Sequence, residues 1–252
     1  MILLFDIGNT HTHLGLATPA RVVRQVNVPT REWFGGWAVA LVKKFVGAKK
    51  ITGAMLCSVV PRATPVVRQT IQKNWHQRAR ELNAQTVRGV GIDYPRPQTI
   101  GPDRLANSVA ARKLFGAPVV VVDFGTAVTF DVVNSKGNYV GGIIAPGLAA
   151  MTDYLHEKTA LLPHIKISEP RQVIGKSTEQ AMLAGAVYGY RGLVRELIRE
   201  LKLKMQARRL PVVATGGYAK LIAAGLPEIS AVEPNLTLEG LRLVWLDLGQ
   251  PK

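Results

Sequence analysis

The chain has 252 residues, of which 47% are hydrophobic, and it carries a formal net charge of +15 at pH 7. This length suits one large domain or two domains of about 120 residues, each able to bury a core. No apolar run approaches the ~18–20 residues of a membrane span, and Asp6 within the apolar N-terminus indicates a strand and not a signal peptide. A single cysteine, Cys57, excludes an internal disulfide and any cysteine-built metal site, so we expect a cytoplasmic protein.

The positive charge has two interpretations: it can draw in anionic substrates, or it can bind nucleic acid. The densest region runs from Arg191 to Arg209, where Arg191, Arg195, Arg199 and Lys202 recur at helical spacing. A solvated helix face explains this spacing better, because no aromatic–basic interleaving, helix-turn-helix pattern or zinc finger accompanies it. Nucleic acid is therefore the less favoured partner.

The first predicted elements are three strands with a distinctive turn after the first. Residues 2–5 form an apolar run, residues 6–10 (Asp-Ile-Gly-Asn-Thr) form the turn, and residues 13–17 and 21–28 form two further strands. An Asp-x-Gly turn can direct backbone N–H groups and a Thr hydroxyl at a phosphate while its carboxylate faces a cation.

Helices and strands then alternate. We expect a helix over 31–46, a strand over 51–60, a helix over 61–80, a short strand or loop over 83–90 and a helix over 104–115. The first of these helices carries an apolar stripe that we expect to be core, made of Trp33, Phe34, Trp37, Leu41 and Phe45.

A proline-rich loop from Tyr94 to Pro102 leads into the helix over 104–115 and places Asp103 at its start. Two interpretations of Asp103 stay open. It can cap the helix N-terminus, as short acidic side chains often do. It can also be a carboxylate on a rigid loop that accepts a proton from a substrate.

The central stretch repeats the N-terminal pattern. Four valines, 119–122, indicate a strand buried on both faces, which ends in the turn Asp123-Phe-Gly-Thr126. Strands over 127–133 and 138–145 follow. Two copies of this pattern predict a duplicated domain with one phosphate-handling hairpin in each half. The alternative is that Asp-x-Gly, a common turn signal, occurs twice by chance.

The remaining elements contain two further glycine-rich segments. We expect helices over 147–160, 179–204 and 238–246, and strands over 210–214 and 229–233. Gly175-Lys-Ser177 resembles the tail of a Walker A motif, but Pro170 stands where the earlier glycine is required. Thr178 can be a helix N-cap. Gly216-Gly217 at a helix start allows close approach of a nucleotide ring or phosphate, although two glycines alone are weak evidence.

Seven short motifs follow one another along the chain: Asp6–Thr10, Gly101–Arg104, Asp123–Ala127, Gly141–Gly147, Thr159–Pro163, Ile174–Thr178 and Thr215–Gly217. In this order and spacing they resemble the type III pantothenate kinases of the acetate kinase–sugar kinase–actin superfamily. The resemblance covers residues 2 to about 245. It implies an α/β fold of duplicated actin-like (ribonuclease H-like) domains, each a mixed sheet flanked by helices, with a cleft between them. We place the domains at 1–115 and 116–252.

The resemblance implies ATP-dependent phosphorylation of pantothenate to 4′-phosphopantothenate, the first step toward coenzyme A. ATP would contact both Asp-x-Gly turns and the Gly-Gly segment, through Asp6, Ile7, Gly8, Asn9, Thr10, His11, Thr12, His13, Thr126, Gly216 and Gly217. Pantothenate would contact Tyr94, Gly101, Pro102, Asp103, Arg104 and Thr178, with Asp103 as the general base.

The resemblance also implies two cations and a partner subunit. Asp6 would hold Mg²⁺ through water, and Asp123 would ligate a monovalent cation, K⁺ or NH₄⁺. Members of this family are homodimers with the substrate pocket at the subunit interface. The residue types suit this chemistry, because a carboxylate can take the proton of an alcohol nucleophile and hydrated Mg²⁺ needs only one or two carboxylates.

Two alternatives remain at the level of the sequence. The chain could be a kinase of the same superfamily with another small-molecule substrate. It could also be an inactive or moonlighting basic regulator that binds nucleic acid, in which case its affinity for DNA or RNA would fall steeply with salt. The presence of Asp6, Asp103, Asp123 and Thr126 argues against a decayed site.

Overall fold

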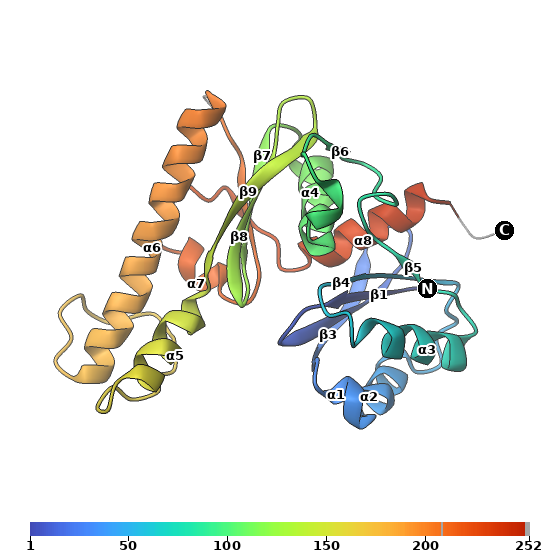
Figure 1. The fold of residues 1–252 in the computed structure, drawn as a ribbon, viewed down its shortest axis with the longest axis horizontal. Coiled ribbons are helices and arrows are strands. Elements are labelled where there is room, and N and C mark those ends of the chain that lie inside the picture. The colour runs from blue at the N-terminus through green and yellow to red at the C-terminus, as the bar shows by residue number, and fades with distance from the viewer. Residues whose placement is uncertain (208, 250–252) are drawn as a thin grey trace. The chain divides into compact units, whose positions relative to one another are not determined.

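A computed structural model describes residues 1–207 and 209–249 (Figure 1). The chain divides into two compact units. Unit 1 contains Met1–Gly116, Gly137–Val140 and the chain from Asn235 onward, and unit 2 contains Ala117–Lys136 and Gly141–Pro234. None of the helices in the described residues combines the length and the apolarity that crossing a bilayer requires.

Unit 1 is built on a five-stranded mixed sheet with the order β3-β2-β1-β4-β5. Its central strand β1 pairs antiparallel with β2 and parallel with β4. The strands are β1 (Ile2–Ile7), β2 (His11–Ala17), β3 (Val22–Pro29), β4 (Gly53–Ser58) and β5 (Arg80–Glu81). The helices are α1 (Glu32–Gly35), α2 (Trp37–Val46), α3 (Thr64–Trp75), α4 (Pro102–Phe115) and α8 (Leu236–Asp247), with a 3₁₀ turn at Pro97–Thr99.

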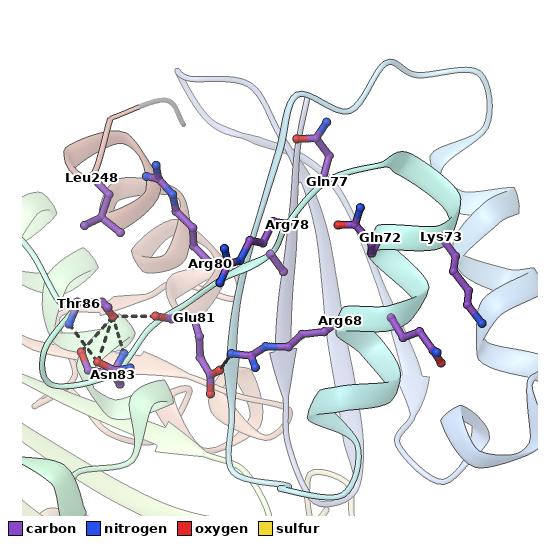
Figure 2. Close-up of a pocket in the computed structure, with 12 residues that line it drawn as sticks. Arg68, Gln72, Lys73, Gln77, Arg78, Arg80, Glu81, Asn83, Thr86 and Leu248 are labelled. Atoms are coloured by element: carbon purple, nitrogen blue, oxygen red, sulfur yellow. Dashed lines mark hydrogen bonds and ion pairs between the residues drawn. The ribbon is translucent and has the colours of Figure 1, made fainter. Parts of the chain in front are cut away.

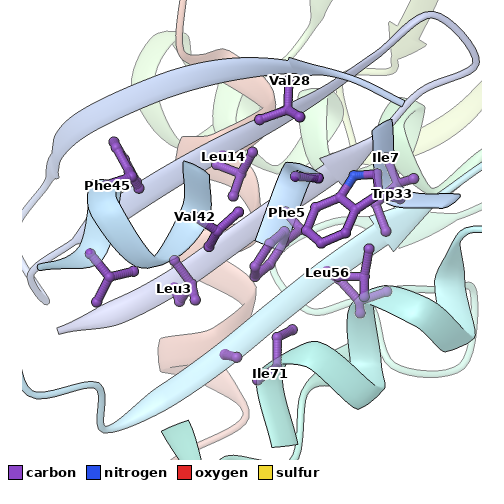
Figure 3. Packing of buried hydrophobic residues seen from close by; sticks show 14 of the residues in the cluster. Leu3, Phe5, Ile7, Leu14, Val28, Trp33, Val42, Phe45, Leu56 and Ile71 are labelled. Carbon is purple, nitrogen blue, oxygen red and sulfur yellow. The ribbon is translucent and has the colours of Figure 1, made fainter. Parts of the chain in front are cut away.

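Both faces of the central strands β1 and β4 are buried, which explains their apolar sequences, whereas the edge strand β3 is largely exposed. Alternate residues of β1, Leu3 and Phe5 among them, pack in one cluster with Trp33, Val42 and Ile71 from α1, α2 and α3 (Figure 3). On the other face α8 packs against β1, β2 and β4 and against α4. A Cβ atom on Gly53 would lie 2.5 Å from the ring of Trp245, so this glycine lets α8 approach β4.

The predicted helix over 31–46 is wrong in one respect. Gly36 adopts a left-handed conformation (φ 80°) and divides the segment into α1 and α2. The interruption rotates the apolar stripe, so that Trp33 and Phe45 are buried while Phe34 and Trp37 are each 53% exposed. The predicted helix over 61–80 is also shorter, because His76 takes the left-handed conformation (φ 54°) that ends α3.

Unit 2 repeats the sheet of unit 1. Its strands lie in the order β11-β10-β7-β8-β9, with β7 antiparallel to β8 and parallel to β10. They are β7 (Val119–Phe124), β8 (Ala127–Val133), β9 (Asn138–Pro146), β10 (Val212–Thr215) and β11 (Ala231–Val232). The helices are α5 (Leu148–Lys158), α6 (Thr178–Met205) and α7 (Ala219–Ala223). The short β6 (Gly91–Ile92) pairs with Asn138 and Tyr139, the part of β9 that belongs to unit 1.

The two halves match residue by residue at their centres, which confirms the predicted duplication. β1 and β7 have six residues each, and in both only the fifth, Asp6 or Asp123, is half-buried while the others are buried. The parallel neighbour of Asp6 is Cys57 on β4, and that of Asp123 is Thr215 on β10. The fold therefore places one carboxylate at the same position of each central strand.

The sequence predicted a domain boundary at residue 115, but the C-terminal helix is counted with the first unit. α8 was expected in the second half, but it packs on α4 and on β1 and is therefore counted in unit 1. A Cβ atom on Gly240 would lie 2.0 Å from the carbonyl oxygen of Ala106, so the backbones of α8 and α4 touch at this point. Thr237 also donates a hydrogen bond of 2.8 Å to Asn107 on α4.

Candidate active site

The first Asp-x-Gly turn lies between β1 and β2 and is braced from inside. The N–H of Gly8 donates to the carbonyl of His11 (3.0 Å), and the hydroxyl of Thr30 donates to the carbonyl of Gly8 (2.6 Å). Asn9, Thr10 and His11 are exposed, as a phosphate-binding turn requires. The turn presents its outer residues on a fixed backbone.

Two residues assigned to this turn face the protein interior. Ile7 is buried, and the buried hydroxyl of Thr12 accepts a hydrogen bond from the indole N–H of Trp33 (2.9 Å) and lies 3.1 Å from the hydroxyl of Thr30. Successive side chains of a β-strand point to opposite faces of the sheet, so the neighbours of an outward-facing residue face inward. Their side chains are therefore not available to ATP.

Asp6 sits in a partly buried polar cluster. The thiol of Cys57 donates to its Oδ1 (Sγ–Oδ1 3.3 Å), and Nδ1 of His13 lies 3.8 Å from its Oδ2. Burial, together with the charge of Asp103, raises the pKa of Asp6 to about 7, while the hydrogen bond from Cys57 opposes this. A desolvated carboxylate of this kind gains from a nearby cation, so Asp6 fits the role of a magnesium ligand through water.

Asp103 is not the N-cap of α4, which corrects one of its two interpretations. Gly101 occupies the N-cap position and Pro102 begins the helix, so Asp103 is the second helical residue. Its Oδ1 accepts from the backbone N–H of Arg104 (2.9 Å). Burial raises the pKa of Asp103, and the hydrogen bond and charge of Arg104 oppose that rise. The carboxylate is thus held in place with an increased affinity for a proton.

Two tyrosines of unit 1 pack in sequence against Arg104, the neighbour of Asp103. The guanidinium carbon of Arg104 lies 5.8 Å from the ring centre of Tyr139, and the ring centres of Tyr94 and Tyr139 are 6.0 Å apart. A Cβ atom on Gly101 would lie 2.5 Å from Oδ1 of Asp103, so glycine is required beside that carboxylate. Gly101 and Arg104 therefore contact Asp103, and Arg104 connects it through Tyr139 to Tyr94.

Tyr139 and Cys57 are members of this cluster that the sequence does not reveal. Tyr139 precedes the glycines of β9, and its relation to Tyr94 follows from the β6–β9 pairing. Cys57 reaches Asp6 through the parallel pairing of β1 and β4. Strand pairing between distant segments was the missing information in both cases. The apolar run before Cys57 indicated a strand, but it did not identify the neighbouring strand.

The second Asp-x-Gly turn brings three predicted motifs together in unit 2. The N–H of Gly125 donates to the carbonyl of Ala127 (3.1 Å), and Thr126 is exposed at the tip. A Cβ atom on Gly147 would lie 2.2 Å from the carbonyl oxygen of Thr126, and one on Gly216 would lie 2.6 Å from Oδ1 of Asp123. The motifs at 123–127, 141–147 and 215–217 thus share one site around Asp123.

Gly216 offers a direct test of this packing. It has φ +92°, a conformation that L side chains rarely adopt, and its missing Cβ is the space that Asp123 occupies. We expect Gly216→Ala to lower the free energy of unfolding by roughly 2–4 kcal/mol. Gly217→Ala is the matched control, because nothing lies within 4 Å of its Cβ position. Thermal unfolding of both variants checks this, and equal melting temperatures would contradict it.

Thr178 is the first residue of α6, and the N-cap is Ser177, whose hydroxyl accepts from the N–H of Gln180 (3.3 Å). The cap interpretation of Thr178 is therefore wrong, and its side chain is exposed in the first turn of the helix. The segment before α6 is anchored by Arg191, a buried residue of α6 that binds both carboxylate oxygens of Glu169 (2.9 and 2.7 Å). Thr178 belongs to unit 2, and Asp103 belongs to unit 1.

Duplicated β-β-β sheets with an aspartate at the end of each first strand, and glycine-bounded turns beside it, define an actin-like phosphotransferase. Solved structures agree on the fold. A protein assigned as a 2-dehydro-3-deoxygalactonokinase from Sinorhizobium meliloti matches with a TM-score of 0.63 at 13% identity over 100% of both chains. A protein assigned as a Baf family transcriptional activator from Campylobacter jejuni matches with a TM-score of 0.61 at 18% identity over 98% of both chains.

Sequence comparison identifies the particular family. The profile of the type III pantothenate kinases matches residues 2–200. The chain is 49% identical over 242 residues to the type III pantothenate kinase of Akkermansia muciniphila, covering 96% of each chain. It is 41% identical over 244 residues to that of Methylacidiphilum infernorum, covering 96% of this chain and 87% of the relative. The chain belongs to the type III pantothenate kinase family, and its enzyme class is pantothenate kinase.

Proposed function

We propose that Asp103 is the general base of this pantothenate kinase, which transfers the γ-phosphoryl group of ATP to the pantothenate hydroxyl in the first step toward coenzyme A. The hydroxyl oxygen forms a bond to the γ-phosphorus as the bond to the β-phosphate oxygen breaks, and the hydroxyl proton passes to Asp103. The observation that carries this role is a fixed, half-buried carboxylate with a raised pKa beside Arg104. Arg104 balances the charge of the anionic substrate, and Thr178 contributes a hydroxyl to it.

ATP phosphates are the ligands that suit the two turns. The exposed backbone of Asn9, Thr10 and His11 supplies N–H groups from the first turn, and Thr126 supplies a hydroxyl from the second. Phosphoryl transfer depends mostly on positioning and on neutralising charge. Mg²⁺ supplies that neutralisation when it is bound, and Asp6 is the residue that would hold it through water. Gly216 and Gly217 leave the backbone of unit 2 open to the nucleotide.

Cys57 orients the carboxylate of Asp6. Burial and the neighbouring charges of Asp6 and Asp103 raise the pKa of its thiol, so the sulfur keeps its proton and remains a donor. The hydrogen bond to Oδ1 leaves Oδ2 facing His13. Cys57 is thus a positioning residue, and it does not contact the substrate in this mechanism.

Asp123 would hold the monovalent cation, K⁺ or NH₄⁺. It occupies the position in unit 2 that Asp6 occupies in unit 1, beside the exposed tip of the second turn. The turn consists of Gly125 and Thr126, and the carbonyl oxygens of both lie against Gly147. Carboxylate and carbonyl oxygens are the donors that hard cations prefer.

ADP release by the purified protein tests the reaction and this cation assignment together. With ATP, Mg²⁺ and pantothenate, we expect release to require both pantothenate and potassium, with a much lower rate in sodium. Asp123→Asn is expected to reduce the rate in potassium to the sodium rate, because the variant lacks the charged ligand. ADP release without pantothenate would contradict the proposal that pantothenate is the phosphoryl acceptor. Equal rates of the unmodified enzyme in potassium and sodium would contradict the role of Asp123.

We further propose that this cytoplasmic enzyme is a homodimer that associates through an apolar surface of unit 2. A pocket of about 550 Å³ between α5 and α6 is lined mainly by apolar side chains, including Met151, Leu155 and Met182. Near it in sequence, Leu161 is 89% exposed and Ile174 is 81% exposed. Apolar exposure of this extent is typical of a surface that a second subunit covers.

Oligomeric state on dilution tests this surface. We expect the double variant Tyr154→Ser/Leu155→Ser to sediment as a monomer at micromolar concentration and to lose specific activity, because the apolar contact area is reduced. Leu203→Ser is the control, since Leu203 is 61% exposed near the far end of α6. The unmodified enzyme should lose specific activity on dilution. If the double variant remains a dimer, the surface around the α5–α6 pocket is not the dimer interface.

A further inference from the structure

Unit 1 has a pocket between α3 and the chain that leads into β5 (Figure 2). Its volume is about 860 Å³, within the range of small-molecule sites. The proposed catalytic mechanism uses none of its residues. They are Arg68, Gln69, Gln72, Lys73, Gln77, Arg78, Ala79, Arg80, Glu81, Asn83, Thr86 and Leu248.

The charge of this pocket is strongly unbalanced. Four cationic side chains line it (Arg68, Lys73, Arg78 and Arg80) against the single carboxylate of Glu81, a difference of three positive charges. Glu81 is already paired with Arg68, as Figure 2 shows. Positive charges gathered in this way repel one another, and a bound anion removes that repulsion.

The other three cationic side chains of the pocket differ in their hydrogen bonding. Arg80 donates from Nη1 to the carbonyl of Gly249 (2.5 Å), which fixes its guanidinium at one side of the pocket. Within the part of the chain that the structure describes, Lys73 and Arg78 have no hydrogen bond or ion pair. Three glutamine amides lie beside them and can donate to or accept from the uncharged part of a ligand.

We propose that this pocket binds a multiply phosphorylated small molecule. The excess of three positive charges calls for a ligand with two or more negative charges, and arginine suits phosphate because its planar donors match the phosphate oxygens. Nucleic acid fits less well. The pocket is concave and bounded, and no aromatic side chain is among the described residues that line it, so it lacks the stacking surface that binds single strands.

Calorimetric titration with tripolyphosphate tests the proposal. Saturating Mg²⁺ and a non-hydrolysable ATP analogue are present throughout, so that the catalytic site is occupied. We expect one equivalent of tripolyphosphate to bind, and Lys73→Gln/Arg78→Gln to weaken the binding roughly tenfold or more through the loss of charge-assisted hydrogen bonds. The matched control is Lys43→Gln/Lys44→Gln, which removes two exposed charges from α2.

Several results would overturn the proposal. They are no binding in the presence of the ATP analogue, equal weakening in both double variants, or tighter binding of a single-stranded oligonucleotide that Lys73→Gln/Arg78→Gln abolishes. The last result would make the surface a nucleic-acid site. Pantothenate kinase activity of both double variants should equal that of the unmodified enzyme, so a failure here is distinguishable from a failure of the proposed catalytic mechanism.

Discussion

Asp103→Asn is expected to lower kcat by about 10²–10⁴-fold, the usual contribution of a general base. Asparagine keeps the size of the side chain and can still accept from the N–H of Arg104, so α4 should begin as before. It cannot take the hydroxyl proton. The KM values for ATP and pantothenate should stay near those of the unmodified enzyme, because the lost interaction is made in the transition state.

Pantothenate-dependent ADP release in potassium measures this effect. Asp247→Asn is the control, since Asp247 is exposed at the C-terminal end of α8. Near-normal turnover by Asp103→Asn would exclude Asp103 as the base. A fall in kcat with a melting temperature well below that of the unmodified enzyme would instead indicate a structural role, which unchanged circular dichroism would rule out.

Asp6→Asn is expected to have opposite effects on activity and on stability. Folding raises the pKa of Asp6 from 3.8 to about 7, so the folded state binds the proton more tightly than the unfolded state. The stabilisation that this gives is fully present below about pH 4 and is lost as the pH rises to about 7. Asparagine has no charge to desolvate. At pH 8 the metal-free variant should therefore gain about 1–3 kcal/mol in the free energy of unfolding.

Denaturant unfolding of the metal-free protein at two pH values checks the stability effect. The difference between Asp6→Asn and the unmodified protein should appear at pH 8 and vanish toward about pH 3, below the unfolded-state pKa of 3.8, where the carboxyl of Asp6 is protonated in both the folded and unfolded states. The same variant should lose most kinase activity, because Asp6 no longer offers Mg²⁺ a charged ligand. A variant that is less stable at pH 8 would contradict the account of its burial.

The alternation of apolar runs and turns was enough to predict both triple-strand units and the helices that follow them. It succeeded because Val119–Val122 and the apolar N-terminus are strands buried on both faces, and such strands are continuous apolar runs in the sequence. It failed at Gly35-Gly36, because the prediction followed the apolar stripe across a glycine pair that is itself a turn signal, and Gly36 takes a positive φ. The place of α8 also escaped prediction, since only tertiary packing decides which sheet a C-terminal helix covers.

The site was predictable where one segment carries it. The turns after Asp6 and Asp123 and the loop before Asp103 are local in sequence, and each is a turn or loop in the structure as the motifs indicated. Thr12 was misplaced, because a motif written as a continuous run ignores which side of a strand each residue faces. Cys57 was missed for the opposite reason, since its contact with Asp6 crosses two strands that are 51 residues apart in the chain.

The duplicated hairpins differ in the length of their turns, although the paired strands match, with six residues in β1 and β7 and seven in β2 and β8. The connection between β1 and β2 spans residues 8–10, whereas that between β7 and β8 spans only 125–126. The first turn therefore carries one more backbone N–H group than the second. The two copies thus differ in the turn that follows the central strand and not in the lengths of the strands around it, so the turns are where the two halves can differ in the ligand they bind.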